Sequence, residues 1–122
     1  MGIDIYAHWD GESAEDMHEQ VSSWLSIEAG DRGYLREAYH GEPYATRYLC
    51  AEAFETGEAR IPASVLADRL PVALSIAEER ERSLYGKNGH PEAVTQSFRD
   101  FVAFCERKER ESGAPVRIVA FY

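Results

Sequence analysis

Residues 3–10 read IDIYAHWD, and this stretch decides the fold class. Apolar Ile3, Ile5 and Ala7 alternate with Asp4, Tyr6 and His8. This period of two predicts a strand with one buried face, and the Asp10-Gly11 pair that follows indicates a turn. The chain closes with PVRIVAFY at residues 115–122, which predicts a second strand. We expect the two terminal strands to be neighbours in one sheet.

Two long helices are predicted between these strands. The first covers residues 61–86 and keeps one apolar face, with Pro71 marking either a kink or a junction of two helices. The second covers residues 91–112, and Gly113 is its stop signal. The sequence therefore predicts a single α+β domain over residues 1–122, in which a small, mainly antiparallel sheet with both terminal strands packs against two long helices.

Two shorter segments are less regular. A short helix is predicted after the first strand, with Ser13 as its N-cap. Residues 21–27 also fit the alternation of a strand, so the second half of this segment stays open between helix and strand. Residues 45–54 are expected to begin in an extended conformation. The apolar residues of the short helix recur at helical spacing and are Met17, Val21, Trp24 and Leu25.

The chain is acidic, with 13 Lys and Arg against 22 Asp and Glu and a formal net charge of -9. Such a charge repels a nucleic-acid backbone, so we expect no binding to duplex nucleic acid and favour a basic protein as a protein partner. No stretch approaches the roughly 18–20 apolar residues of a membrane span, and the N-terminus lacks the features of a signal peptide. We therefore expect a cytoplasmic protein that does not bind membranes.

Residues 30–49 read GDRGYLREAYHGEPYATRYL and differ from the rest of the chain. This segment contains four of the seven tyrosines and three arginines, and its charges sum to zero. Arginine offers a planar fork of donors for phosphate or carboxylate, and tyrosine offers a flat face for stacking. We interpret the segment as an Arg/Tyr-rich loop that binds an anionic, nucleotide-like small molecule. The candidate ligand-binding residues are Arg32, Tyr34, Arg36, Tyr39, His40, Tyr44 and Arg47.

The same residues have a purely structural interpretation. The tyrosines of the segment would then complete the core, while the arginines would pair with Asp31, Glu37 and Glu42.

The two cysteines, Cys50 and Cys105, lie far apart in the sequence and are expected to be buried free thiols.

Signals for catalysis and for metal binding are weak. Asp4, His8 and Asp10 share one face of the first strand, and the His8-x-Asp10 spacing can place an imidazole and a carboxylate on one cation. The chain has no HExxH, GxSxG, GxGxxG or P-loop motif. We therefore expect no catalytic residue, no metal site and no cofactor.

Several blocks of the sequence resemble a group of small bacterial and phage-borne proteins of about this length. The blocks are GIDIYAHWDG at 2–11, GYLREAYHGEPYATRYL at 33–49, IPASVLADRLP at 61–71 and EERER at 78–82. No activity is known for that group. The resemblance spans nearly the whole chain and implies one small stand-alone domain, and it assigns no role to any residue.

Three classes of function remain open. The favoured one is a non-enzymatic protein that binds or sequesters the nucleotide-like anion. The second is an acidic inhibitor or immunity-type protein that binds a basic protein. The third is a small metal-dependent hydrolase that uses His8 with Asp10, or His40. A homo-oligomer is compatible with the first class, because an edge strand and an aromatic patch can pair with a second copy.

Overall fold

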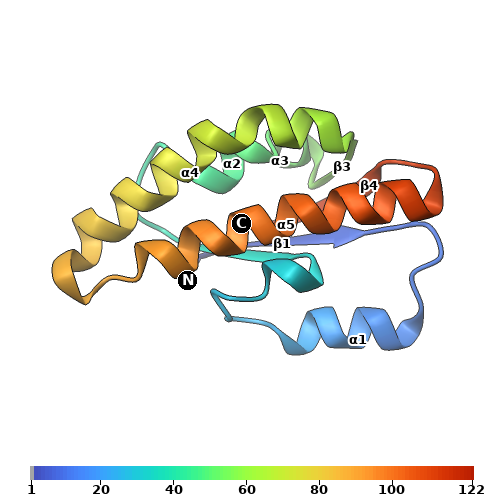
Figure 1. Cartoon of the computed structure of the whole chain (residues 1–122), viewed down its shortest axis with the longest axis horizontal. Coiled ribbons are helices and arrows are strands. Elements are labelled where there is room, and N and C mark those ends of the chain that lie inside the picture. The colour runs from blue at the N-terminus through green and yellow to red at the C-terminus, as the bar shows by residue number, and fades with distance from the viewer. Residues whose placement is uncertain (1) are drawn as a thin grey trace.

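The computed structural model describes residues 2–122, which form one four-stranded sheet and its helices (Figure 1). The strands are β1 (Gly2–His8), β2 (Tyr34–Ala38), β3 (Glu58–Ile61) and β4 (Val116–Phe121). The α-helices are α1 (Ala14–Ser22), α2 (Ala45–Leu49), α3 (Ala53–Thr56), α4 (Ala63–Tyr85) and α5 (Pro91–Ser112). Two short 3-10 helices, η1 (Gly30–Arg32) and η2 (Gly86–Asn88), complete the regular structure of the described residues.

The sheet has the strand order β2-β1-β4-β3, and every adjacent pair is antiparallel. The two terminal strands, β1 and β4, lie at its centre, with Ile5 opposite Ala120. This pairing confirms that the ends of the chain are neighbours in one sheet. The edges of the sheet are β2 and β3.

Helices α4 and α5 run along one face of the sheet, as Figure 1 shows. Alternate residues of β1, namely Ile3, Ile5 and Ala7, belong to the main buried cluster together with Leu66 of α4 and Phe101 of α5. Burial of large apolar side chains between a sheet and a helix layer is the main stabilising contribution in such a fold. The predicted α+β class is confirmed.

The opposite face of the sheet carries a small buried cluster of Tyr6, Ala29 and Tyr34. In Figure 1, α1 lies at the bottom of the view, apart from α4 and α5.

Ser13 caps α1 as predicted, because its hydroxyl accepts the N–H of Asp16 at 3.0 Å. The Asp16 carboxylate accepts the N–H of Ser13 at 3.2 Å in return. This reciprocal pair fixes the start of the helix.

Both long helices lie where the sequence places them. Helix α5 spans the predicted residues and ends at Gly113, whose φ of 81° is in the left-handed region that favours glycine. Helix α4 runs through Pro71 as one helix of 23 residues, so the alternative of two separate helices is wrong. Among residues 2–122, no helix combines the length and the apolar character needed to cross a membrane.

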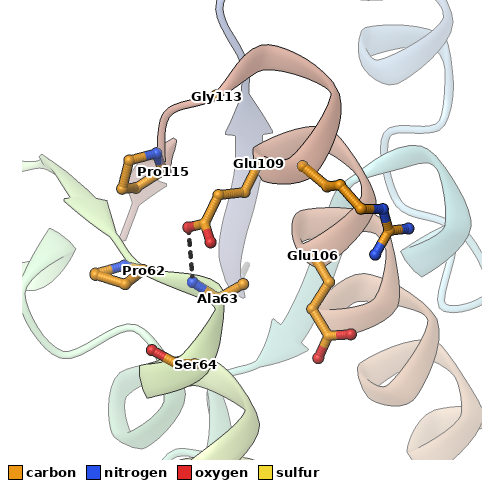
Figure 2. A pocket seen from close by; sticks show the side chains of 8 residues that line it. Pro62, Ala63, Ser64, Glu106, Glu109, Gly113 and Pro115 are labelled. Carbon is orange, nitrogen blue, oxygen red and sulfur yellow. Dashed lines mark hydrogen bonds between the residues drawn. The ribbon is translucent and has the colours of Figure 1, made fainter.

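An open hollow of about 690 Å³ lies where β3 leads into α4 and where α5 ends (Figure 2). In its wall, the Glu109 carboxylate accepts the N–H of Ala63 at 3.0 Å. Ala63 is the first residue of α4, so a carboxylate already occupies the positive end of this helix. The hollow therefore does not present a free helix N-terminus to an anion.

Two local expectations are wrong, and one strand was not predicted. Residues 45–54 do not begin as an extended segment, since they contain α2 and the start of α3. The Arg/Tyr-rich segment is not one loop, because residues 34–38 form β2 and pair with β1. The short strand β3 has no counterpart in the prediction. Contacts between residues far apart in the sequence explain the first two: Glu37 bonds to Thr46, and β2 pairs with β1.

Cys50 and Cys105 are both buried and unbonded, which confirms the expectation of free thiols. Burial raises the pKa of each thiol above its ordinary value. A thiol that stays protonated and buried is a poor nucleophile. We therefore expect neither cysteine to react with DTNB in the native protein at pH 8 and both to react in denaturant, as followed by absorbance. Rapid modification of one thiol in the native protein would contradict this.

Candidate functional site

The predicted ligand-binding residues are distributed over several elements. Arg36 and His40 line one groove, whereas Tyr44 and Arg47 line a separate hollow. Arg32 lies in η1, and Tyr34 and Arg36 lie in β2. Tyr39, His40 and Tyr44 lie between β2 and α2, and Arg47 lies within α2.

Tyr34 and Arg36 both contact Asp4 on the outer face of the sheet. The buried Tyr34 hydroxyl donates to Asp4 Oδ1 at 2.5 Å and accepts the N–H of Leu25 at 2.9 Å. Arg36 Nη1 donates to the same Asp4 oxygen at 2.8 Å. Burial, with a smaller contribution from the bond to Asp4, raises the pKa of the Tyr34 phenol. Asp4 therefore holds two of the side chains that the sequence suggested for a ligand.

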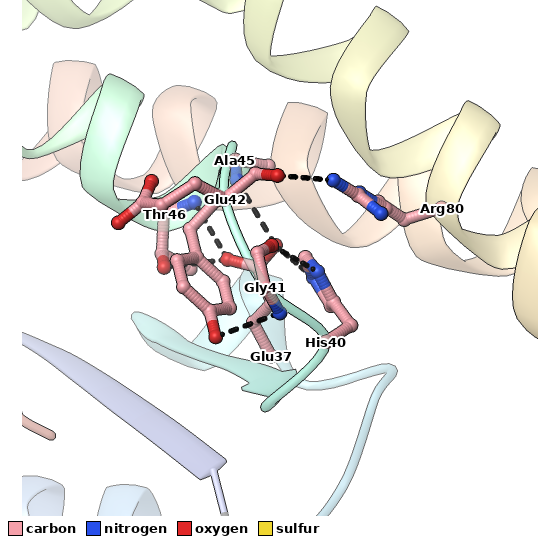
Figure 3. A network of polar contacts seen from close by, with 8 residues as sticks. Glu37, His40, Gly41, Glu42, Ala45, Thr46 and Arg80 are labelled. Carbon is pink, nitrogen blue, oxygen red and sulfur yellow. Dashed lines mark hydrogen bonds and ion pairs between the residues drawn. The ribbon is translucent and has the colours of Figure 1, made fainter.

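Figure 3 shows a polar network around the buried Glu37 carboxylate. Its Oε1 accepts the N–H and the hydroxyl of Thr46, at 2.9 and 2.6 Å, and its Oε2 accepts the N–H of Ala45 at 3.0 Å. His40 Nε2 lies 2.8 Å from Oε2, and its Nδ1 lies 2.9 Å from the carbonyl oxygen of Gly41. The carboxylate thus joins β2 to the start of α2, which is why residues 45–49 become helical.

Tyr44 and Arg47 lie close to this network, just before α2 and within it. The Tyr44 ring packs on the His40 ring with 4.6 Å between centroids. Arg47 Nη1 pairs with Glu42 Oε1 at 2.8 Å, as the structural interpretation predicted, and its guanidinium lies 5.2 Å from the centre of the Phe54 ring. These are contacts within the chain, and they give Arg47 both a carboxylate and an aromatic partner.

The remaining two candidates lie elsewhere. Arg32 Nη1 donates to the Ser23 hydroxyl at 3.1 Å, and the Tyr39 side chain is half exposed. All three arginines of the segment thus have a partner within the chain, and for Arg36 and Arg47 that partner is a carboxylate.

Asp4, His8 and Asp10 point to different partners. Asp4 contacts Tyr34 and Arg36 as described, and His8 Nδ1 lies 2.7 Å from Glu12 Oε1. Asp10 pairs with Arg60 at 3.0 Å. Among the residues that the structure describes, no group of three His, Cys, Asp or Glu side chains is placed to hold a metal ion.

Large apolar side chains are exposed in and after α1. Each of them exposes 43–59% of its surface, with Trp24 at the upper end. Exposed apolar patches mark interaction sites in soluble proteins, and these side chains all come from residues 17–27. We call this set the Trp24 patch, and its members are Met17, Val21, Trp24, Leu25 and Ile27. The apolar stripe predicted along one helix is only partly present, because α1 ends at Ser22 and only Met17 and Val21 lie on it; these two side chains face solvent.

The buried residue of α1 is instead Gln20, which is 1% exposed. Its Nε2 donates to the carbonyl oxygen of Ala7 at 2.6 Å, just beyond the last residue pair between β1 and β2. A buried carbonyl without a partner is costly, and the Gln20 amide supplies that partner. Because Gln20 is directed to the end of the strand pairing, Met17 and Val21 of the same helix are left exposed.

Leu25, one of the patch residues, holds an unfavourable backbone conformation. Its φ of 74° is the one positive φ of a non-glycine residue among those described. The left-handed region costs an L-residue about 1–2 kcal/mol. The Leu25 N–H donates to the buried Tyr34 hydroxyl, which keeps the turn on the sheet. Strained residues that the surrounding fold maintains are concentrated at functional sites.

The patch lies in a strongly acidic part of the chain. Residues 1–31 contain eight Asp and Glu and no Lys or Arg. Glu15 and Glu19 are exposed on α1, and Glu28 and Asp31 are exposed beyond it. Exposed carboxylates and the exposed apolar side chains therefore come from the same segment of the chain.

A groove of about 250 Å³ adjoins this patch, since Ile27 lines it. One wall is the edge strand β2, and the other walls come from the end of α4 and the start of α5. The apolar lining residues from the two helices are Ala77, Leu84, Tyr85, Val94 and Phe98. Of the charged lining residues, Arg80 donates to the carbonyl oxygen of Glu42 at 2.5 Å, and Glu81 accepts the N–H of His90 at 2.9 Å.

Comparison with known proteins gives no family: no family model, no curated protein and no solved structure matches the chain.

Proposed function

We propose that the protein is a non-enzymatic binding protein whose Trp24 patch docks a basic protein partner. The observation that carries this proposal is the orientation of α1, which buries Gln20 and exposes Met17 and Val21. Exposed apolar side chains accompanied by charged ones are typical of a protein interface, and tryptophan is enriched among the residues that dominate binding energy.

Charge favours a basic partner over a second copy of the chain. The protein carries a net charge of -9, and residues 1–31 contain no positive side chain. A twofold contact through the Trp24 patch would bring two acidic segments together, which costs free energy. A positive partner is attracted at long range instead, so its association should weaken as salt is added.

The two other classes of function have less support. A nucleotide-like anion would have to compete with Asp4 for Arg36 and with Glu42 for Arg47. A metal-dependent hydrolase needs ligands that converge, and Asp4, His8 and Asp10 each have a different neighbour.

The test is a fluorescence titration with a synthetic amphipathic helical peptide of leucine and lysine. The protein carries Trp9→Phe, so that Trp24 is the sole tryptophan. We expect a blue shift of Trp24 emission on binding, because the indole leaves water. The same peptide with glutamate in place of lysine should not bind, and added salt should weaken binding of the lysine peptide.

Matched variants locate the contact. Val21→Ser within the patch should weaken binding of the lysine peptide about tenfold. Val72→Ser, at a residue of α4 that is 45% exposed and outside the patch, should leave it unchanged. Equal effects of the two substitutions, or equal binding of the glutamate peptide, would refute the proposal. So would sedimentation of a dimer that Val21→Ser dissociates.

A further inference from the structure

The edge strand β2 has backbone groups available for another strand. The N–H of Tyr34 donates to Ala29, so it points away from β1. Because outward and inward groups alternate along an antiparallel strand, the backbone N–H and C=O of Arg36 and the N–H of Ala38 also point outward. Within residues 2–122, no backbone hydrogen bond reaches these outward groups of Arg36 and Ala38. An edge with free donors and acceptors is a template for strand addition.

The groove supplies side-chain contacts beside this free edge. Arg36 and Ala38 line it from β2, and Leu84, Val94 and Phe98 line it from the helices. In β-strand addition, the backbone bonds give affinity and pockets for alternate side chains give specificity. A free edge beside an apolar groove provides both.

The opposite edge of the sheet is protected in the usual ways. Strand β3 has only four residues and is followed at once by Pro62. Its Glu58 and Arg60 side chains are about half exposed. Short length, proline and charge all discourage pairing at an edge, so β2 is the edge suited to a partner.

We propose that β2 accepts an extended segment of the basic partner as a fifth strand, with an apolar side chain of that segment in the groove. This inference rests on the proposed function, because Ile27 belongs both to the Trp24 patch and to the groove. A second copy is a poorer occupant. Antiparallel pairing of two β2 strands centred on Arg36 would place Arg36 opposite its symmetry mate and bring together two chains of charge -9.

The test uses a synthetic extended peptide of alternating valine and lysine and follows amide hydrogen exchange of the unmodified protein by NMR. At saturating peptide, the amide protons of Arg36 and Ala38 should exchange at least about tenfold more slowly. Ala38→Pro removes one outward N–H from the end of the strand and should weaken binding about tenfold. Ala38→Val keeps that N–H and should bind as the parent protein does.

Each outcome decides the proposal. Unchanged exchange at Arg36 and Ala38 under saturating peptide overturns it, even if Ala38→Pro proves unstable. Slow exchange at both amides in the free protein, together with a dimer in sedimentation, also overturns it, because a second copy then fills the edge. If Val21→Ser weakens binding of the helical peptide while the β2 amides show no protection from exchange, docking on the Trp24 patch is supported and strand addition is refuted. If β2 is protected but Val21→Ser has no effect, strand binding is retained and the proposed docking on the patch fails.

Discussion

Glu37→Ala is expected to lower the free energy of unfolding by about 3–5 kcal/mol. The carboxylate lies on the buried face of β2 and accepts hydrogen bonds from Ala45 and Thr46. It also faces a nitrogen of His40, whose side chain is only 3% exposed. Alanine would leave these buried donors without an acceptor, and water cannot fully replace it. The first turn of α2 should lose its anchor to the sheet.

Urea denaturation of the variant, followed by circular dichroism, measures this loss. Glu42→Ala is the matched control, because it removes a carboxylate that is 62% exposed and pairs with Arg47 at the surface. That change should alter stability by about 1 kcal/mol or less. A Glu37 variant as stable as the Glu42 variant would show that the network in Figure 3 does not hold α2 in place.

The elements that the sequence predicts well are those whose signals are local. Helix α5 has a proline at its first residue, a regular apolar stripe and Gly113 at its end. Strands β1 and β4 show alternation that matches their buried faces, with Ile5 and Ile118 fully buried. Periodicity and end signals act within a few residues, so they can be recognised without knowledge of the fold.

Helix α2 could not be predicted in this way, because its N-terminal anchor comes from another element. The Glu37 side chain reaches Thr46 across nine positions of the chain, and only the course of β2 brings the two together. Without that carboxylate, residues 45–49 have no side-chain cap of their own. Tertiary contacts of this kind override weak local preferences.

The composition of residues 30–49 identifies the kinds of side chain but not their partners. Arg36 pairs with Asp4, which is 32 positions away and outside the segment. The sequence offered Asp31, Glu37 and Glu42 as the acids for its arginines, and of these only Glu42 takes that role, with Arg47. Which arginine is available to a ligand therefore depends on strand register, which composition does not contain.

The Trp24 patch shows that helical periodicity, like composition, does not identify what a side chain contacts. A stripe at helical spacing predicts an apolar helix face, but it shows neither that α1 ends at Ser22, before Trp24 and Leu25, nor which layer the face contacts. The carbonyl of Ala7, at the end of the β1–β2 pairing, places Gln20 inside. A glutamine within the apolar stripe of a short helix gives no sequence signal of such a role.

Gly30→Ala is expected to cost about 3 kcal/mol or more. A Cβ at this position would lie 1.9 Å from the carbonyl oxygen of Ser97 and 3.0 Å from the backbone nitrogen of Phe101. Both atoms belong to the backbone of α5, which cannot rotate away as a side chain would. Either α5 or η1 must shift, and Phe101 is a fully buried member of the main cluster. Thermal and urea unfolding of the variant measure the loss.

Gly11→Ala is the control, since Gly11 has a φ of 98° and no atom within 4 Å of an added Cβ. It should cost only about 1 kcal/mol, from backbone strain alone. A Gly30 variant no less stable than the Gly11 variant would mean that η1 does not pack closely on α5.

The packing of η1 on α5 also bears on peptide binding, because η1 follows the turn that carries Trp24 and Leu25. If this close approach fixes the turn, Gly30→Ala should weaken binding of the lysine peptide at temperatures where the variant is still folded. Gly11→Ala should leave binding of that peptide unchanged.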